Sequence, residues 1–294
     1  MASLESVPAL AGPDADLFTL AGDPLVEAVT AAVRAHMTRY DGSHDFHHIR
    51  RVVGLARHLT AAEEARGVVV NRRLVVLAAL LHDVGDHKYA DVSVDEGTPG
   101  ERGHGQHPGD EDGATLDPAS ASVAAVLRRC AAVAAASPAA TATAACPPDL
   151  VRQVCLVCRH VSWSTETKTA ASAAATAALA ARHPELAIVQ DADRLDALGA
   201  VGLARCFAFG ATARASQAAG AKPETGASRT LDASLDHVDS KLVRVEARMK
   251  TVAGRQLARE RTERLRTFQA WFRDEAAWAV PNPLDEINGA GGPQ

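Results

Sequence analysis

The segment at residues 74–84 constrains the fold most, because it is apolar on nearly every side until it reaches two titratable residues. It reads Leu-Val-Val-Leu-Ala-Ala-Leu-Leu-His-Asp-Val. A helix that is apolar all round belongs in the centre of a protein rather than at its surface. Gly85 follows, at a position where a glycine commonly ends a helix. The segment therefore predicts a central helix that carries His82 and Asp83 at its buried end.

The other patterned stretches repeat their apolar residues at steps of three and four, as amphipathic helices do. These stretches cover residues 24–37, 48–59, 149–160, 170–182, 192–209 and 235–277. The last is expected to break near residues 251–254, and Ser43 is expected to cap the helix that contains His48. Strict alternation of apolar and polar residues persists nowhere. The sequence therefore predicts an all-α fold.

One helical domain is expected between residues 24 and 278. The segments around and within it are a loose leader at 1–23, a disordered tail at 279–294 and two insertions at about 91–147 and 211–229. The insertions are expected to be flexible, because their polar or low-complexity stretches bury too little apolar surface to offset the entropy lost on ordering. Within the first insertion, the Ala-rich stretch at 119–136 can be helical.

Charge and composition exclude several classes of partner. With 31 Lys and Arg against 36 Asp and Glu, the formal net charge is −5, so neither a nucleic-acid polymer nor a membrane surface is the expected partner. No apolar run of about 18 residues predicts a membrane span, and no signal peptide is expected. Five thinly spread cysteines favour a reducing compartment, so the expected location is cytoplasmic. Cys155 and Cys158 have redox or zinc spacing, but they stand within an apolar helical pattern and are interpreted as buried cysteines.

Four titratable side chains on or at the ends of apolar helices are candidate metal ligands. They are His48, His82, Asp83 and Asp193. A buried charge is costly unless a partner satisfies it, and one divalent cation would satisfy imidazoles and carboxylates together. Taken alone, His82 and Asp83 could equally form a structural hydrogen bond. Such a mixed nitrogen and oxygen site suits Mn²⁺ as the first expectation, with Mg²⁺, Fe²⁺, Co²⁺ or Ni²⁺ as alternatives.

The candidate ligands fall within longer motifs. Residues 43–52 read Ser-His-Asp-Phe-His-His-Ile-Arg-Arg-Val, residues 81–89 read Leu-His-Asp-Val-Gly-Asp-His-Lys-Tyr, residues 159–163 read Arg-His-Val-Ser-Trp, and residues 190–199 read Gln-Asp-Ala-Asp-Arg-Leu-Asp-Ala-Leu-Gly. In this order they resemble the HD-domain superfamily of metal-dependent phosphohydrolases. The resemblance extends over about residues 24–278, apart from the insertions, and implies that the four candidates hold one divalent ion.

The same resemblance implies roles for six residues around the ion. Asp86 and His160 are expected to be catalytic, and His44, Arg51, Lys88 and Asp196 are expected to bind the substrate. Arg51 lies three residues after His48, on the same helix face, so it could reach a phosphate or form a surface salt bridge. Asp196 lies one helical turn after Asp193, so both carboxylates can face one pocket, although a place on the helix surface stays open. The two residues after Gly85 could be ordinary loop charges.

By this resemblance, the activity is that of a phosphohydrolase acting on a small phosphorylated molecule, with a nucleotide as the first choice. Pyrophosphohydrolysis of a nucleoside triphosphate and dephosphorylation of a nucleoside monophosphate are the two reactions to test first. No oligomeric state is predicted. An alternative from another class is a non-catalytic protein that senses a nucleotide in the same pocket.

Overall fold

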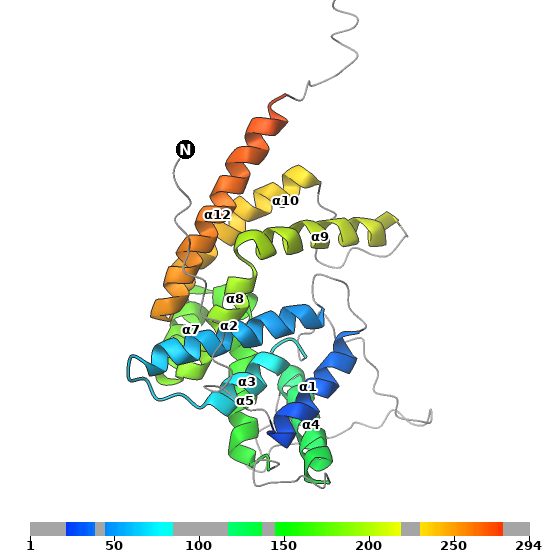
Figure 1. Cartoon of the computed structure of the whole chain (residues 1–294), viewed down its shortest axis with the longest axis vertical. Helices are drawn as coiled ribbons and strands as arrows, with labels where there is room; N and C mark the ends of the chain where they lie inside the picture. The colour runs from blue at the N-terminus through cyan, green and yellow to red at the C-terminus, as the bar shows by residue number, and fades with distance from the viewer. Residues whose placement is uncertain (1–21, 39–44, 85–116, 137–144, 219–229, 279–294) are drawn as a thin grey trace, which may run out of the picture.

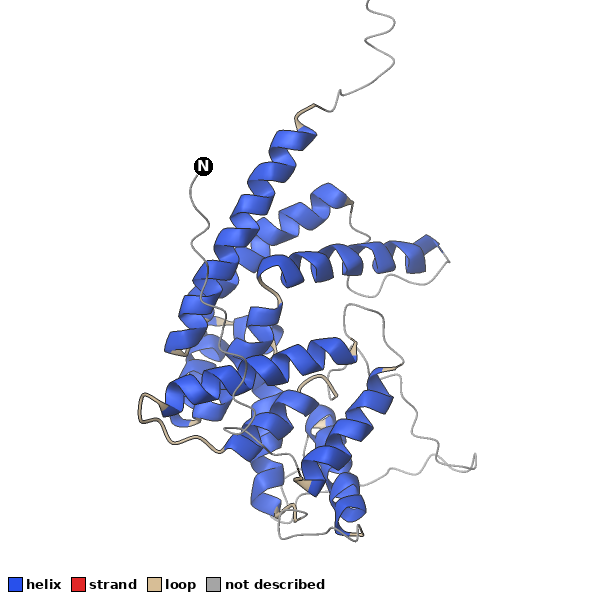
Figure 2. Cartoon of the chain, in the orientation of Figure 1, coloured by secondary structure: helices blue, strands red, loops and turns tan. Residues whose placement is uncertain are grey.

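The computed structural model describes residues 22–38, 45–84, 117–136, 145–218 and 230–278, and every regular element within these ranges is a helix (Figures 1 and 2). The α-helices are α1 (Pro24–Met37), α2 (Phe46–Glu64), α3 (Arg72–Leu81), α4 (Pro118–Ala135), α5 (Pro148–Val161), α6 (Trp163–Thr167), α7 (Ala170–Arg182), α8 (Pro184–Asp196), α9 (Gly199–Ala218), α10 (Leu231–His237), α11 (Val243–Val245) and α12 (Val252–Ala276). The all-α fold expected from the periodicity is confirmed.

Helix α3 lies at the centre of the bundle, as its apolar sequence predicts. Every residue from 74 to 81 is buried, and the helix packs against α1, α2, α5 and α8. It ends at Leu81, earlier than expected from Gly85, and the Val84 amide donates to the Leu81 carbonyl in the turn that follows. His82 and Asp83 therefore lie in a turn at the buried end of α3.

The expected helix at 192–209 is wrong, because the chain turns between α8 and α9 instead of continuing. Gly199 has a φ of +69°, a conformation that side chains with a Cβ rarely adopt, and α9 begins there. Pro184 starts α8 eight residues before the expected beginning. Asp193 consequently lies in the last turn of α8 rather than at the start of a helix.

Helix α4 lies inside the stretch expected to be a flexible insertion, yet it is part of the core. Its apolar face, which includes Val123 and Leu127, is buried, and it packs against α1 and α5. Asp117 caps it by accepting hydrogen bonds from the Ser120 amide and hydroxyl, at 3.1 and 2.7 Å. The Ala-rich stretch thus forms the helix that its composition allows.

Two further segments are more ordered than expected from their composition. Helix α9 runs to Ala218, into the second expected insertion. At the end of the expected leader, Asp23 caps α1 and forms an ion pair with Arg73, with 2.7 Å between its Oδ2 and the Arg73 Nε. The structure does not describe the expected tail.

The C-terminal part consists of helices that meet at a break, as predicted. Between α10 and α12 the chain passes through a π-helical turn (Val238–Leu242), α11 and a 3₁₀ turn (Glu246–Arg248). Thr251 then caps α12 by accepting a hydrogen bond from the Gly254 amide. Helices α9, α10 and α12 lie together in the upper part of Figure 1. Among the described residues, no helix is both long enough and apolar enough to cross a membrane.

Candidate metal centre

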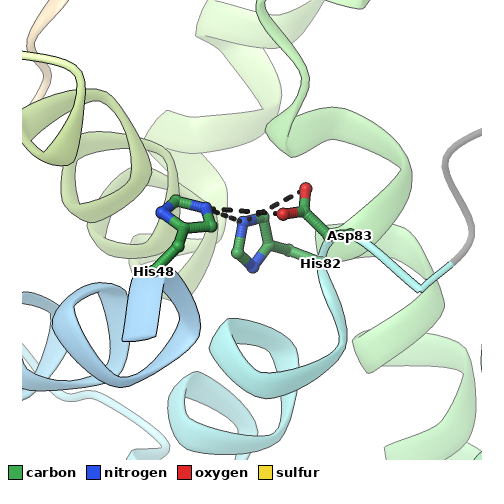
Figure 3. A group of neighbouring side chains, drawn as sticks. All are labelled: His48, His82 and Asp83. Atoms are coloured by element: carbon green, nitrogen blue, oxygen red, sulfur yellow. Dashed lines mark hydrogen bonds and ion pairs between the residues drawn. The ribbon is translucent and has the colours of Figure 1, made fainter. Parts of the chain in front are cut away.

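Three helices bring the four candidate ligands together. Asp45, rather than the expected Ser43, caps α2 by accepting a hydrogen bond from the His48 amide at 3.1 Å, which places His48 in the first turn. His82 and Asp83 follow the end of α3, and Asp193 lies in the last turn of α8. Figure 3 shows the first three side chains directed toward one another.

The ligand atoms converge on one small volume. The Nε2 atoms of His48 and His82 lie 3.3 Å apart. Asp83 Oδ2 lies 3.4 Å from the His48 nitrogen and Asp83 Oδ1 lies 3.4 Å from the His82 nitrogen. Asp193 Oδ1 lies 3.6 Å from both nitrogens. The structure therefore places together all four side chains that the sequence singled out as metal ligands.

The hydrogen-bond partners of the two Nδ1 atoms determine whether each Nε2 atom carries a hydrogen or offers a lone pair. His48 Nδ1 lies 2.8 Å from the Asp196 carboxylate, and His82 Nδ1 lies 2.9 Å from the Ala79 carbonyl. Both partners accept hydrogen bonds, so each Nδ1 must carry the hydrogen and donate it. In the neutral imidazole each Nε2 then offers a lone pair, and two lone pairs and two carboxylates face a common point. Such a set of acceptors fits a cation, and its nitrogen and oxygen chemistry fits a divalent transition metal or Mg²⁺.

Protons compete with a metal ion for the same nitrogens. Burial lowers the pKa of His82, but the carboxylates of Asp83 and Asp193 outweigh burial and raise it to about 9. Burial likewise opposes a rise in the pKa of His48, yet the hydrogen bonds to Asp196 and Asp83 raise it. Burial raises the pKa of Asp193, whereas His82 and His48 lower it by a greater amount. The centre thus attracts positive charge strongly, and metal binding would release protons.

Asp196 lies behind His48 rather than in the cavity, so the structure does not bring it to where a substrate would bind. Its side chain is 1 % exposed, and its oxygens accept hydrogen bonds from His48, Arg51 and Arg205. Burial raises the pKa of this carboxyl, but His48 and Arg51 hold it well below the usual range. A carboxylate that accepts from the outer nitrogen of a metal-binding histidine orients the ring and makes it a better ligand.

Arg51 is occupied by the same carboxylate. Its Nε and Nη2 donate to the two oxygens of Asp196, at 2.7 and 3.0 Å. This two-pronged ion pair lies between α2 and α8 and is partly exposed. The expected salt-bridge alternative for Arg51 is therefore present, although its partner is the buried Asp196.

A cavity of about 420 Å³ adjoins the metal centre and includes the four candidate ligands in its lining. This volume lies within the roughly 300–1,000 Å³ typical of small-molecule pockets. Its basic lining residues are Arg159, Arg194, Arg205 and Lys241. The cavity therefore combines a cation-binding centre with side chains that favour an anionic ligand.

Sequence reasoning missed Arg205, which lies on α9 and donates from Nη1 to Asp196 Oδ2 at 2.9 Å. A signal was present, because Arg205 lies between Leu203 and Cys206 on an otherwise apolar stretch of helix. A cation in such a place needs an anionic partner. Only the fold shows that the partner is the carboxylate behind His48.

One further predicted site residue, His160, is not brought into this cavity. Its Nδ1 donates to the Leu156 carbonyl within α5 at 2.9 Å. His44, Asp86 and Lys88 lie outside the described residues. Their expected roles stay predictions.

Cys155 and Cys158 are thiols, as expected. The Cys155 Sγ donates to the Ser120 carbonyl and the Cys158 Sγ to the Ala78 carbonyl. Burial raises the pKa of Cys155 to about 11 and also raises that of Cys158. Thiols with raised pKa values are poor nucleophiles and poor metal ligands at neutral pH. Cys155 is buried, as interpreted, whereas Cys158 is only partly buried.

Comparisons with known proteins match the part of the chain that contains three of the four candidate ligands. The HD domain family model matches residues 45–116. The YpgQ protein of Bacillus subtilis is 45 % identical over 73 residues, which are 25 % of this chain and 31 % of that relative. The match therefore spans less than a third of the relative's length.

Solved structures resemble the fold over most of the chain. The crystal structure of Bacillus subtilis YpgQ in complex with ADP has a TM-score of 0.50 at 23 % identity, over 88 % of this chain and 96 % of that one. An HD-superfamily hydrolase from Bacillus thuringiensis has a TM-score of 0.51 at 23 % identity, over 88 % and 100 %. A Lactobacillus plantarum protein has a TM-score of 0.53 at 22 % identity, over 87 % and 98 %. The family match thus places an HD domain at residues 45–116, which contain His48, His82 and Asp83, and the solved structures show that the fold is shared over most of the chain.

Proposed function

We propose that the protein is a divalent-metal-dependent phosphohydrolase acting on a small phosphorylated molecule, with a nucleotide as the first candidate. The observation that carries the proposal is the convergence of His48, His82, Asp83 and Asp193 from three helices within 3.3–3.6 Å contacts. These four side chains would hold the ion. We propose Mn²⁺ first, because the site mixes imidazole and carboxylate donors without a thiolate.

The residues in and behind the cavity would each have a distinct role. A bound divalent ion supplies Lewis acidity and lowers the pKa of a coordinated water. Asp83 and Asp193 would offset most of the charge of the ion, and Asp196 would keep the His48 ring aligned. Arg205 and Lys241, which line the same cavity, would bind phosphate oxygens.

The choice of a nucleotide is supported by the YpgQ structure, which was solved with ADP. The size of the cavity and its basic lining agree with a nucleotide carrying phosphate groups. Pyrophosphohydrolysis of a nucleoside triphosphate and removal of phosphate from a nucleoside monophosphate are the two reactions we propose to test first.

The test is release of phosphate or pyrophosphate from a panel of nucleotides by the purified protein with Mn²⁺. Replacing a ligand, as in His48→Ala, should lower turnover by more than the roughly 10–100-fold that loss of an outer partner costs. His47→Ala is the matched control, because His47 is the neighbouring histidine but is exposed on α2, and it should leave turnover unchanged. Turnover that survives His48→Ala, or tight nucleotide binding without product under any metal, would overturn the proposal, and the latter would favour a sensor.

A further inference from the structure

The cavity has a second wall that the proposed metal chemistry does not use. It comes from the junction of α5 and α6, where Ser162, Trp163, Ser164 and Thr165 all line the cavity. Trp163 is partly buried, so its indole packs on the core while part of it borders the open space. One short stretch thus offers a flat aromatic surface flanked by hydroxyl groups.

The indole is held in place by two arginines. The guanidinium carbons of Arg194 and Arg248 lie 5.5 and 6.0 Å from the centre of a Trp163 ring. Both distances fall within the range of about 6 Å over which a cation and an aromatic ring attract each other. These two contacts therefore help to hold the orientation of Trp163.

A buried carboxylate fixes these two arginines. Glu166, on the same short helix as Trp163, has a side chain that is 5 % exposed, and it pairs with Arg194, Arg248 and Lys250. Burial raises the pKa of Glu166, but Arg194 and Lys250 lower it by a greater amount, so the carboxylate stays charged. Removing one member of a buried ion network is strongly destabilising, so Glu166 restrains the two arginines that contact the indole.

Helix α8 links the metal centre to the aromatic wall, the stretch of residues 162–165 that contains Trp163. Arg194 follows Asp193 directly on α8, and both line the cavity. Asp193 faces the two histidines, and Arg194 binds Glu166. One helix therefore contributes both a candidate metal ligand and a side chain that contacts the indole.

We infer that Trp163 receives the base of the substrate nucleotide while the phosphates lie toward the metal centre. This inference rests on the proposed function and narrows its substrate class to nucleotides, as opposed to sugar phosphates or inorganic polyphosphate. A base and an indole attract by stacking regardless of base identity, so the wall selects for a base without choosing among bases. The hydroxyl groups beside it offer hydrogen bonds to the base edge or the ribose.

The first test compares a nucleoside triphosphate with inorganic tripolyphosphate as substrates of Trp163→Leu. Loss of one base–aromatic contact, worth roughly 5- to 150-fold in binding, should raise the nucleotide KM by that factor. The KM for tripolyphosphate should stay within about twofold of wild type, and Trp163→Phe should restore most of the nucleotide affinity. Trp271→Phe, which alters an exposed tryptophan of α12, is the matched control and should change neither KM.

The second test needs neither turnover nor a change at Trp163. In a Trp271→Phe, Trp278→Phe protein, Trp163 is the remaining tryptophan, and its fluorescence is titrated with α,β-methylene-ADP and with methylenediphosphonate in the presence of Mg²⁺. We expect the nucleotide analogue to change the emission and its base-free counterpart to leave it unchanged.

The two tests separate the inference from the proposed function. If no phosphate compound is hydrolysed, the phosphohydrolase proposal fails, while the fluorescence titration still decides whether a base contacts Trp163. If Trp163→Leu raises both KM values alike or lowers only the melting temperature, the indole serves the packing of α6 and the inference is wrong. Equal fluorescence responses to the two analogues would likewise overturn it.

Discussion

Replacing Asp196 with asparagine tests whether the carboxylate behind His48 controls metal binding. The substitution keeps the size of the side chain but leaves one acceptor oxygen for three donors, His48, Arg51 and Arg205. The amide NH₂ group must then face at least one of these donors. His48 loses either its hydrogen-bond acceptor or the negative charge that favours Nδ1–H.

The size of the effect follows from the contacts that are lost. Outer carboxylates on metal-binding histidines typically contribute 10–100-fold to metal affinity, which corresponds to about 1.4–2.8 kcal/mol at 25 °C. The value for Asp196→Asn should lie toward the upper end, because the carboxylate is 1 % exposed and accepts from His48 at 2.8 Å. Arg51→Gln removes one donor but leaves the contact with His48, so its effect on metal affinity should be several-fold smaller.

The assay is calorimetric titration of the metal-free protein with Mn²⁺, with helical content and melting temperature measured on each variant. Glu64→Gln is the matched control: it removes a two-pronged arginine pair of similar length, Arg72 Nε and Nη2 to Glu64 at 2.7 Å each, from a partly exposed site that does not line the cavity. It should leave the Mn²⁺ affinity unchanged. A folded Asp196→Asn protein with wild-type Mn²⁺ affinity would refute the assignment of Asp196 as the residue that orients His48.

Three further predictions concern stability. Glu166→Gln should destabilise the protein by roughly 3–5 kcal/mol near neutral pH, as loss of one member of a buried ion network does. The folded-state pKa of Glu166 lies below its ordinary value of 4.5, so the difference in stability from wild type should be full above pH 4.5 and should shrink as the pH falls through the folded-state pKa. Urea unfolding at a series of pH values measures this difference. Equal differences at pH 6 and pH 4 would contradict it. Gly202→Ala should destabilise by roughly 1–3 kcal/mol or more, because a Cβ there would lie 2.1 Å from the Ala197 carbonyl oxygen. At the exposed position 54 of α2 a Cβ would meet nothing within 4 Å, so Gly54→Ala should instead stabilise the protein by roughly 0.4–1 kcal/mol.

Periodicity was sufficient to predict most helices and insufficient to predict where two of them join. The stretch from 192 to 209 carries apolar residues at helical spacing on both sides of the turn, so spacing alone predicts a continuous helix. The decisive feature is the backbone at Gly199, whose positive φ no neighbouring side chain announces. The place of helix α4 in the core was not predicted, because long polar segments flank it in the sequence. Its Ala-rich face nevertheless packs on α1.

The grouping of the four candidate ligands was predictable, whereas its supporting contacts were not. His48, His82, Asp83 and Asp193 are titratable groups on or at the ends of apolar helices, and the motifs around them resemble those of the HD-domain superfamily. The function of Asp196 depends on which residues from α2 and α9 reach it. Those partners lie 145 residues before it and 9 residues after it, and no local spacing relates all three.

Two turns of α8 connect every part of the site. Asp193 Oδ1 faces Nε2 of His48 while Asp196 Oδ2 accepts from Nδ1 of the same ring, which is possible because residues three apart share a helix face. Asp191 points elsewhere and accepts hydrogen bonds from the Thr251 amide and hydroxyl at the start of α12, while Arg194 turns toward Glu166. Because a helix moves as a unit, these side chains cannot be repositioned separately. The alignment of His48, the seating of α12 and the support of the aromatic wall therefore depend on one position of α8.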